Sequence, residues 1–131
     1  MFFLNPRGEI LLLLRDNKPE IPYPNTWDLP GGQMEGSELP SECIRREMDE
    51  ELPGLDLGNF RLCEIMELPQ QVNYIFWTRI DAGEELLNKI LCEGQRAAWM
   101  SRAQIRNTTI AFGFGTVVEK FFDRLEEGML G

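Results

Sequence analysis

The feature that most constrains this chain is an acidic stretch, 35–51, in which seven carboxylates accompany only two arginines. Residues 40–52 have apolar side chains at helical spacing, and the proline at the first position suits the first turn of a helix. On that helix Glu47, Glu50 and Glu51 would share one face. Like charges so placed destabilise a helix by a few tenths of a kcal/mol per pair, and the helix dipole disfavours anions in its last turn. A hard divalent cation would account for the arrangement, because Mg²⁺ takes oxygen ligands.

A rival interpretation is an acidic face exposed to water, with pairs such as Glu42–Arg46 one turn apart, since charge runs in helices are usually solvated. The spacing of the residues before and within the helix favours a metal-binding site instead. Five residues separate Gly32 from Glu38, and seven more separate Glu38 from Arg46. The adjacent glycines before this pattern allow the backbone to approach another group closely.

The rest of the chain predicts a single domain, 1–131, with a mixed α/β sandwich fold. Ile10–Leu14 has the continuous apolar character of a strand buried on both faces. The proline-rich segment 18–25 is expected to be a loop. Further strands are expected at 60–66, 72–80 and 95–100, the last with Trp99 inward, and further helices at 101–106 and 116–127.

The composition of the chain disfavours several classes of binding partner. Thirteen Lys and Arg against 22 Asp and Glu give a net charge of −9, which disfavours nucleic acid and anionic membranes as partners. An acidic protein can still bind a phosphate ligand through a divalent cation. The chain has no histidine and three cysteines, none of them in a C-x-x-C pair, so a zinc site built from Cys and His is not expected. Free thiols suit a reducing cytoplasm. No apolar run is long enough to span a bilayer, and the first residues do not resemble a signal peptide.

The glycine, glutamate and arginine pattern over positions 32–51 resembles the Nudix box, G-x5-E-x7-R-E-U-x-E-E-x-G-U, where U is a bulky aliphatic residue. Positions 32–51 match every specified place, with Met48 as U, and the lead-in 27–32 (Trp-Asp-Leu-Pro-Gly-Gly) and the strand ending in Arg15 are also similar to the family. The end of the box departs from the pattern, because Pro53 stands where Gly is expected. One inserted residue would restore the match through Gly54 and Leu55.

A second resemblance lies after the box. Glu93-Gly94-Gln95, followed by Trp99-Met100, is similar to the segment of MutT-like Nudix enzymes that supplies a further catalytic glutamate from a loop. The alternative is a surface turn with an unremarkable acid. With this segment, the resemblance covers about positions 9–100.

The resemblance implies a Nudix-type α/β/α sandwich with a mixed sheet, and Mg²⁺ as cofactor with Mn²⁺ as a substitute. It implies metal binding by Gly31 (through its carbonyl), Glu47, Glu50, Glu51 and Glu93. Catalytic roles would fall to Glu50, Glu51, Glu93 and Arg46, the last orienting a box carboxylate through a bidentate pair. Glu38 would tie the loop to the helix, Gly32 would lie against substrate, and Arg15 would either bind a terminal phosphate or be a surface charge.

The implied function is hydrolysis of a phosphoanhydride bond in a nucleoside diphosphate linked to another moiety, with a nucleoside triphosphate as the first expectation. Nucleotide sugars, ADP-ribose and dinucleoside polyphosphates are alternatives. A catalytically silent nucleotide-binding module and, last, a calcium-binding domain are alternatives of other classes. The expected partner is a small nucleotide, and the chain is expected to be a monomer or homodimer. Candidates for contacting the base are Trp27, Asn73, Tyr74 and Phe76.

Overall fold

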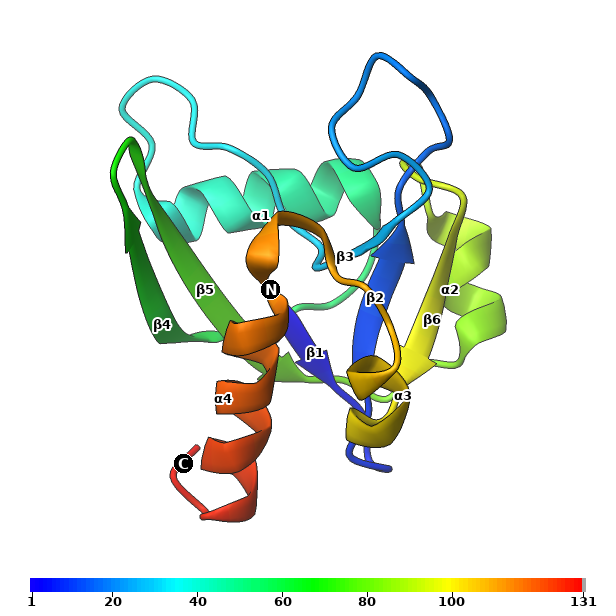
Figure 1. Ribbon diagram of the computed structural model, residues 1–131, viewed down its shortest axis with the longest axis vertical. Helices are drawn as coiled ribbons and strands as arrows, with labels where there is room; N and C mark the ends of the chain where they lie inside the picture. Colours follow the sequence, from blue (N-terminus) through cyan, green and yellow to red (C-terminus); the bar gives the residue numbers. More distant parts are fainter. Residues whose placement is uncertain (131) are drawn as a thin grey trace.

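A computed structural model describes residues 1–130 and confirms the mixed α/β sandwich (Figure 1). One sheet has the order β3-β2-β1-β5-β4, and β6 joins it by pairing with β2 along residues 10–14. β1 and β5 are parallel and all other pairs are antiparallel. The strands are β1 (Phe2–Leu4), β2 (Ile10–Leu14), β3 (Trp27–Asp28), β4 (Arg61–Leu68), β5 (Gln71–Arg79) and β6 (Arg96–Met100).

Helices cover the two faces of the sheet because side chains alternate along each strand. Leu11 and Leu13 of β2 pack in a core with Ile44 and Met48 of α1 (Pro40–Glu51). The opposite side chains of β2 pack in a second core with α3 (Arg102–Arg106) and α4 (Gly115–Glu126), which are joined through the 3-10 turn η1 (Ala111–Gly113). β2 is therefore buried on both faces, as its sequence predicts.

The expected helix 40–52 is α1, and its ends follow from local chemistry. Leu39 has no side chain that can cap the helix, and the Glu42 carboxylate instead accepts a 2.8 Å hydrogen bond from the Leu39 N–H. After the helix, Gly54 takes a φ of 84°, a left-handed conformation that glycine adopts without strain. The departure from the box pattern at Pro53–Gly54 thus forms a turn that returns Leu55 to the core.

The structure contains elements that the sequence did not predict. The apolar start of the chain is a strand, β1, at the centre of the sheet, and the segment 84–90, for which no element was predicted, is a helix, α2 (Glu84–Ile90). α2 covers the edge of β6 with side chains. The Asn88 amide exchanges hydrogen bonds of 2.8 and 2.9 Å with the backbone N–H and C=O of Ala97, and Glu84 accepts a 2.8 Å bond from the Trp99 N–H. Trp99 points inward, as expected.

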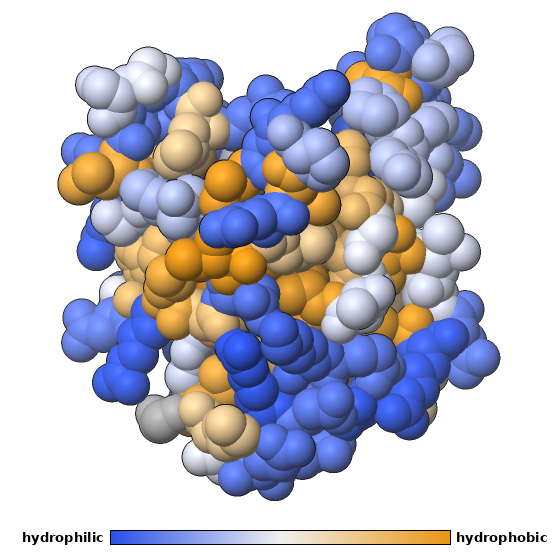
Figure 2. Space-filling view, turned by 60° about the vertical axis from the view of Figure 1, so that its left-hand side comes forward, coloured by the Kyte–Doolittle hydropathy of each residue, from blue (hydrophilic) through white to orange (hydrophobic). Residues whose placement is uncertain are grey.

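The surface shows where the sheet is not covered. β4 forms an edge of the sheet, and its hairpin with β5 exposes Leu62, Ile65 and Val72. Figure 2 turns this side forward and shows apolar surface across the middle of the molecule, with hydrophilic surface above and below it. No helix within residues 1–130 is both long and apolar enough to cross a membrane.

Candidate functional site

Two adjacent glycines bring the loop after β3 against the acidic end of α1. The Gly31 N–H donates a 3.3 Å hydrogen bond to Oε1 of Glu51. At Gly32, a Cβ would lie 2.1 Å from Cδ of Glu47 and 2.3 Å from both of its carboxylate oxygens. The Glu47 carboxylate therefore occupies space that any side chain at position 32 would fill. The close approach expected of these glycines is to helix side chains, whereas the substrate contact of Gly32 stays a prediction.

Glu51 is an unusual carboxylate because it is buried and only half satisfied. It is 5% exposed, and its Oε2 has no hydrogen-bond partner among the described residues. Burial, and after it the negative charge of Glu93, raise its pKa to about 8, and the hydrogen bond from Gly31 only partly opposes them. A buried carboxylate oxygen without a hydrogen-bond partner costs free energy. Binding of a cation or a proton to this oxygen would offset that cost.

Arg46 organises the carboxylates of the box. It forms a bidentate pair with Glu38, with Nε–Oε2 and Nη2–Oε1 distances of 2.7 and 3.0 Å, and its Nη1 lies 2.9 Å from Glu47 and 3.3 Å from Glu50. Nη2 also donates to the backbone carbonyl of Gln33 at 2.9 Å. Arg46 thus fastens the loop 31–39 to α1, and Glu38 ties that loop to the helix as the sequence suggested. The same pairing holds the pKa of Glu38 below its usual range.

The loop carrying Glu93 is fixed at both ends. The Cys92 N–H donates to the backbone carbonyl of Glu51, and the Gln95 N–H donates to that of Leu14, both at 2.8 Å. Gly94 has a φ of 85°, and a Cβ there would lie 2.7 Å from the Leu14 carbonyl oxygen. The charge of Glu93 reaches both Glu47 and Glu51, whose pKa values it raises. The structure therefore brings this loop to the end of α1, as the second resemblance implied.

The donors at this place fit a divalent metal ion. They are carboxylate oxygens, one of them buried without a partner, and burial raises the pKa of both Glu47 and Glu51. Within residues 1–130, however, no three acidic, cysteine or histidine side chains stand close enough together to hold an ion. Glu47 and Glu50 are instead hydrogen-bonded to Arg46. The ligand set Gly31, Glu47, Glu50, Glu51 and Glu93 stays a prediction, and the contact that Gly31 makes is through its N–H rather than the expected carbonyl.

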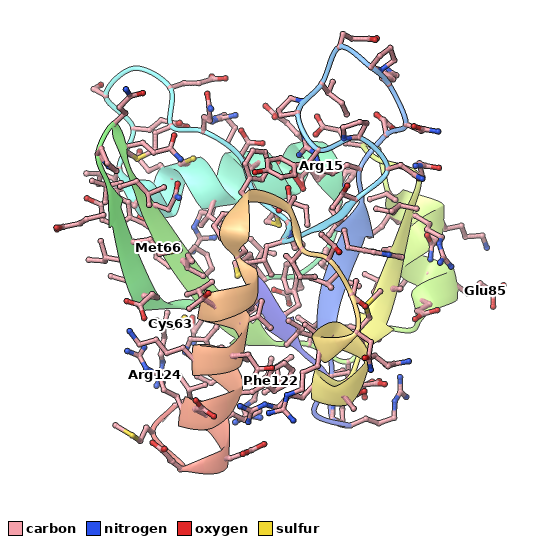
Figure 3. The ribbon with its side chains drawn as sticks, viewed as in Figure 1. Arg15, Cys63, Met66, Glu85, Phe122 and Arg124 are labelled. Carbon is pink, nitrogen blue, oxygen red and sulfur yellow. The ribbon has the colours of Figure 1, made fainter. Side chains whose placement is uncertain are left out.

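Arg15 lies at the end of β2 between η1 and the loop that follows β2 (Figure 3). Its Nη1 pairs with Asp28 at 3.1 Å, and its Nε donates to the Pro22 carbonyl at 3.0 Å. Burial raises the pKa of Asp28, although the Leu29 N–H and Arg15 oppose this. The sequence reasoning missed Asp28 as the partner of Arg15, although it belongs to the box lead-in. Phosphate binding by Arg15 stays a prediction.

The four candidates for contacting a base do not form one pocket. Phe76 is 8% exposed and packs in the core beside α1, so its ring is not available for stacking, and this candidate is wrong. Asn73 and Tyr74 are neighbours on β5, so their side chains leave opposite faces of the sheet. Trp27 is half-buried against the other core, with the Arg96 guanidinium 5.1 Å above its ring.

Comparison with known proteins places this geometry in a family. The family model described as NUDIX domain matches residues 1–121. A comparison with curated proteins found no match.

Solved structures share the fold. The MutT protein from Methanosarcina mazei Go1 superposes with a TM-score of 0.69 at 25% identity, covering 99% of this chain and 91% of that one. The NUDIX domain of Shewanella oneidensis NrtR, complexed with ADP ribose, gives 0.74 at 15% identity, covering 95% and 84%. A Caenorhabditis elegans Ap4A hydrolase binary complex gives 0.71 at 16% identity, covering 96% of each chain. With the matched model, the chain belongs to the NUDIX family.

Proposed function

We propose that this chain hydrolyses a nucleoside triphosphate to the monophosphate and pyrophosphate, in a reaction that requires Mg²⁺. Mn²⁺ is the expected substitute. The three free cysteines suit the reducing cytoplasm as the place of reaction. ADP-ribose, nucleotide sugars and dinucleoside polyphosphates are the competing substrates, because solved structures with this fold include proteins that bind ADP ribose or hydrolyse Ap4A.

The observation that carries the proposal is the unsatisfied oxygen of Glu51. It lies buried at the end of α1, next to Glu47 and within the field of Glu93. A structural carboxylate would be paired with a base or exposed to water. An oxygen kept dry and partnerless beside two further carboxylates is suited to a cation that enters with an anionic substrate.

Different residues of the chain would bind the metal ion, align the carboxylates and accept the proton. Mg²⁺, when held by Glu47, Glu50, Glu51 and Glu93, would neutralise phosphate charge and acidify a water molecule. Arg46 keeps the carboxylates of α1 aligned through its bonds to Glu38, Glu47 and Glu50. Glu93 is exposed and sits on a fixed loop, which suits it to accept the proton from the attacking water.

The test is a panel of nucleotides incubated with the purified chain, with and without Mg²⁺, with products resolved by chromatography. The panel holds nucleoside triphosphates, 8-oxo-dGTP, ADP-ribose, GDP-mannose and diadenosine polyphosphates. Glu50→Gln and Glu51→Gln remove one charge each from the site. Asp49→Asn removes one charge from an exposed position of the same helix and is the matched control.

We expect Mg²⁺-dependent release of pyrophosphate from triphosphates, reduced about 100-fold in both glutamine variants and retained within about twofold in Asp49→Asn. Cleavage confined to ADP-ribose or to a dinucleoside polyphosphate would replace the triphosphate by that substrate. Nucleotides that bind without any turnover would overturn the enzymatic proposal in favour of a binding module.

A further inference from the structure

Two exposed aromatic rings meet at the end of the sheet where the glutamate site lies. Tyr23, in the loop between β2 and β3, is 48% exposed, and Phe112, in η1, is 41% exposed. Their ring centroids are 4.7 Å apart. They come from segments about 90 positions apart in the sequence, so the fold brings them together although neither ring is needed to fill a core.

The backbone at this place is strained. Tyr23, Asn25 and Phe112 have φ values of 50°, 54° and 58°, and among the residues that the structure describes they are the non-glycine residues with positive φ. Such a conformation is unfavourable for an aromatic residue and persists only where its surroundings hold it. Hydrogen bonds hold the loop that carries Tyr23 and Asn25, because Arg15 Nε donates to the Pro22 carbonyl and Gln95 Nε2 donates to Asn25 Oδ1 at 2.8 Å.

Cations accompany the rings in a chain that carries a net charge of −9. The Arg15 guanidinium lies 5.0 Å from the Phe112 centroid, and Arg96 lies over the neighbouring Trp27. A ligand that suits both exposed rings and guanidinium groups is a flat aromatic molecule with a negative charge, which describes a nucleotide.

The residues that hold the loop of Tyr23 lie close in the sequence to residues of the glutamate site. Gln95, whose side chain holds Asn25 and also the Arg15 carbonyl at 2.8 Å, is two residues from Glu93. Asp28, the partner of Arg15, is three residues before Gly31, which is bonded to Glu51. A molecule bound on the rings would therefore lie at the same end of β2 as the carboxylates.

We propose that the exposed faces of Tyr23 and Phe112 form the stacking surface for the base of the nucleotide, with its phosphates toward the glutamates of α1. This inference rests on the nucleotide substrate proposed above. It replaces the four candidates from the sequence, none of which combines exposure with a neighbouring cation at this end of the sheet.

The test measures binding rather than turnover, so it does not depend on catalysis. Calorimetric titrations of the full chain use AMP, GMP, CMP and UMP, and ribose 5-phosphate as the ligand that lacks a base. Phe112→Leu and Tyr23→Leu remove a ring but keep an apolar side chain. Tyr74→Leu removes a ring of similar exposure on β5, which the sequence also suggested, and is the control. Circular dichroism checks that each variant is folded.

We expect each ring variant to weaken the best-bound monophosphate about tenfold or more, without changing the affinity for ribose 5-phosphate, and Tyr74→Leu to bind like the unmodified chain. Equal affinities in all variants, an equal loss for ribose 5-phosphate, a loss confined to Tyr74→Leu, or no binding of any monophosphate by the unmodified chain would overturn the inference. Ring-dependent binding without hydrolysis of triphosphates would leave this site standing and remove the proposed reaction alone.

Discussion

The contact between Gly32 and Glu47 gives a sharp test of the glutamate site, through Gly32→Ala. The new Cβ would lie 2.1 Å from Cδ of Glu47, whereas carbon atoms in contact are about 3.5 Å apart or more. Gly32 does not have a positive φ, so alanine itself is tolerated by the backbone. The strain therefore falls on the Glu47 carboxylate, which must move by about 1.5 Å.

A shift of that size is large for a ligand of Mg²⁺, which demands near-ideal octahedral geometry. We expect kcat/KM for the triphosphate to fall about 100-fold, and the apparent affinity for Mg²⁺ to fall with it. The free energy of unfolding should change by less than about 1 kcal/mol, because Glu47 can rotate toward solvent.

The assays are steady-state kinetics over a range of Mg²⁺ concentrations, and urea unfolding of the metal-free chain. Gly83→Ala is the control, since nothing lies within 4 Å of a Cβ at that position and its φ is −74°. Unchanged kinetics in Gly32→Ala would refute the assignment of Glu47 to the site. A large loss of stability would show that the close approach is structural.

Three further predictions follow from single contacts. Asn88→Ala removes both bonds to Ala97 at the β6 edge and should lower the free energy of unfolding by about 1–2 kcal/mol in urea titrations; no change would mean that water replaces the amide. The folded pKa of Glu51 is about 8, above its ordinary 4.5, so its contribution to stability is complete below pH 4.5 and is lost as pH rises to 8. This contribution should fall by up to about 1.4 kcal/mol per pH unit in metal-free protein, and the fall should be visible between pH 4.5 and 6. Above pH 6 the buried Met1 amino group, whose pKa burial lowers from 8.0 to about 6, contributes a slope of opposite sign. Glu51→Gln should remove the fall between pH 4.5 and 6; equal slopes there in both proteins would contradict the burial argument. Gln95→Leu breaks the bonds to Asn25 and the Arg15 carbonyl and should lower kcat/KM about tenfold with little change in melting temperature, and kinetics like those of the unmodified chain would show that the clamp is dispensable.

The sequence predicted the parts of the fold that depend on local patterns. The helix over 40–52 could be recognised from a proline at its start, apolar residues at helical spacing, and Pro-Gly at its end. The continuous apolar run Ile10–Leu14 identified a strand buried on both faces. α2 was not predicted because Leu87 is its one buried residue, which is too few to give an apolar helical pattern, and its other contacts are made by polar side chains. Asn88 and Glu84 bond to the edge of β6, and no periodicity reveals such contacts in advance.

For the site too, local patterns could be predicted from the sequence and tertiary contacts could not. The order and spacing of the glutamates could be read because one helix carries three of them. That Glu47 fills the space above Gly32, or that Arg46 also reaches the Gln33 carbonyl, depends on a loop conformation that the sequence does not specify. Tyr23 and Phe112 meet through tertiary structure alone, since a proline-rich loop and a glycine-rich turn give no pattern that pairs them.

β2 connects the two halves of the proposed site. The carbonyl of Leu14 receives the Gln95 N–H of the Glu93 loop, and the N–H of Arg15 donates to the Thr26 carbonyl at 2.9 Å, which closes the loop that carries Tyr23. Both segments are therefore anchored to adjacent residues, Leu14 at the end of β2 and Arg15 directly after it. A loop fixed in this way costs little further order on binding, so base stacking and phosphate binding can contribute together to one substrate. The same anchoring explains why strain at Tyr23 and Asn25 is maintained, because relaxing it would also release the loop that presents Glu93.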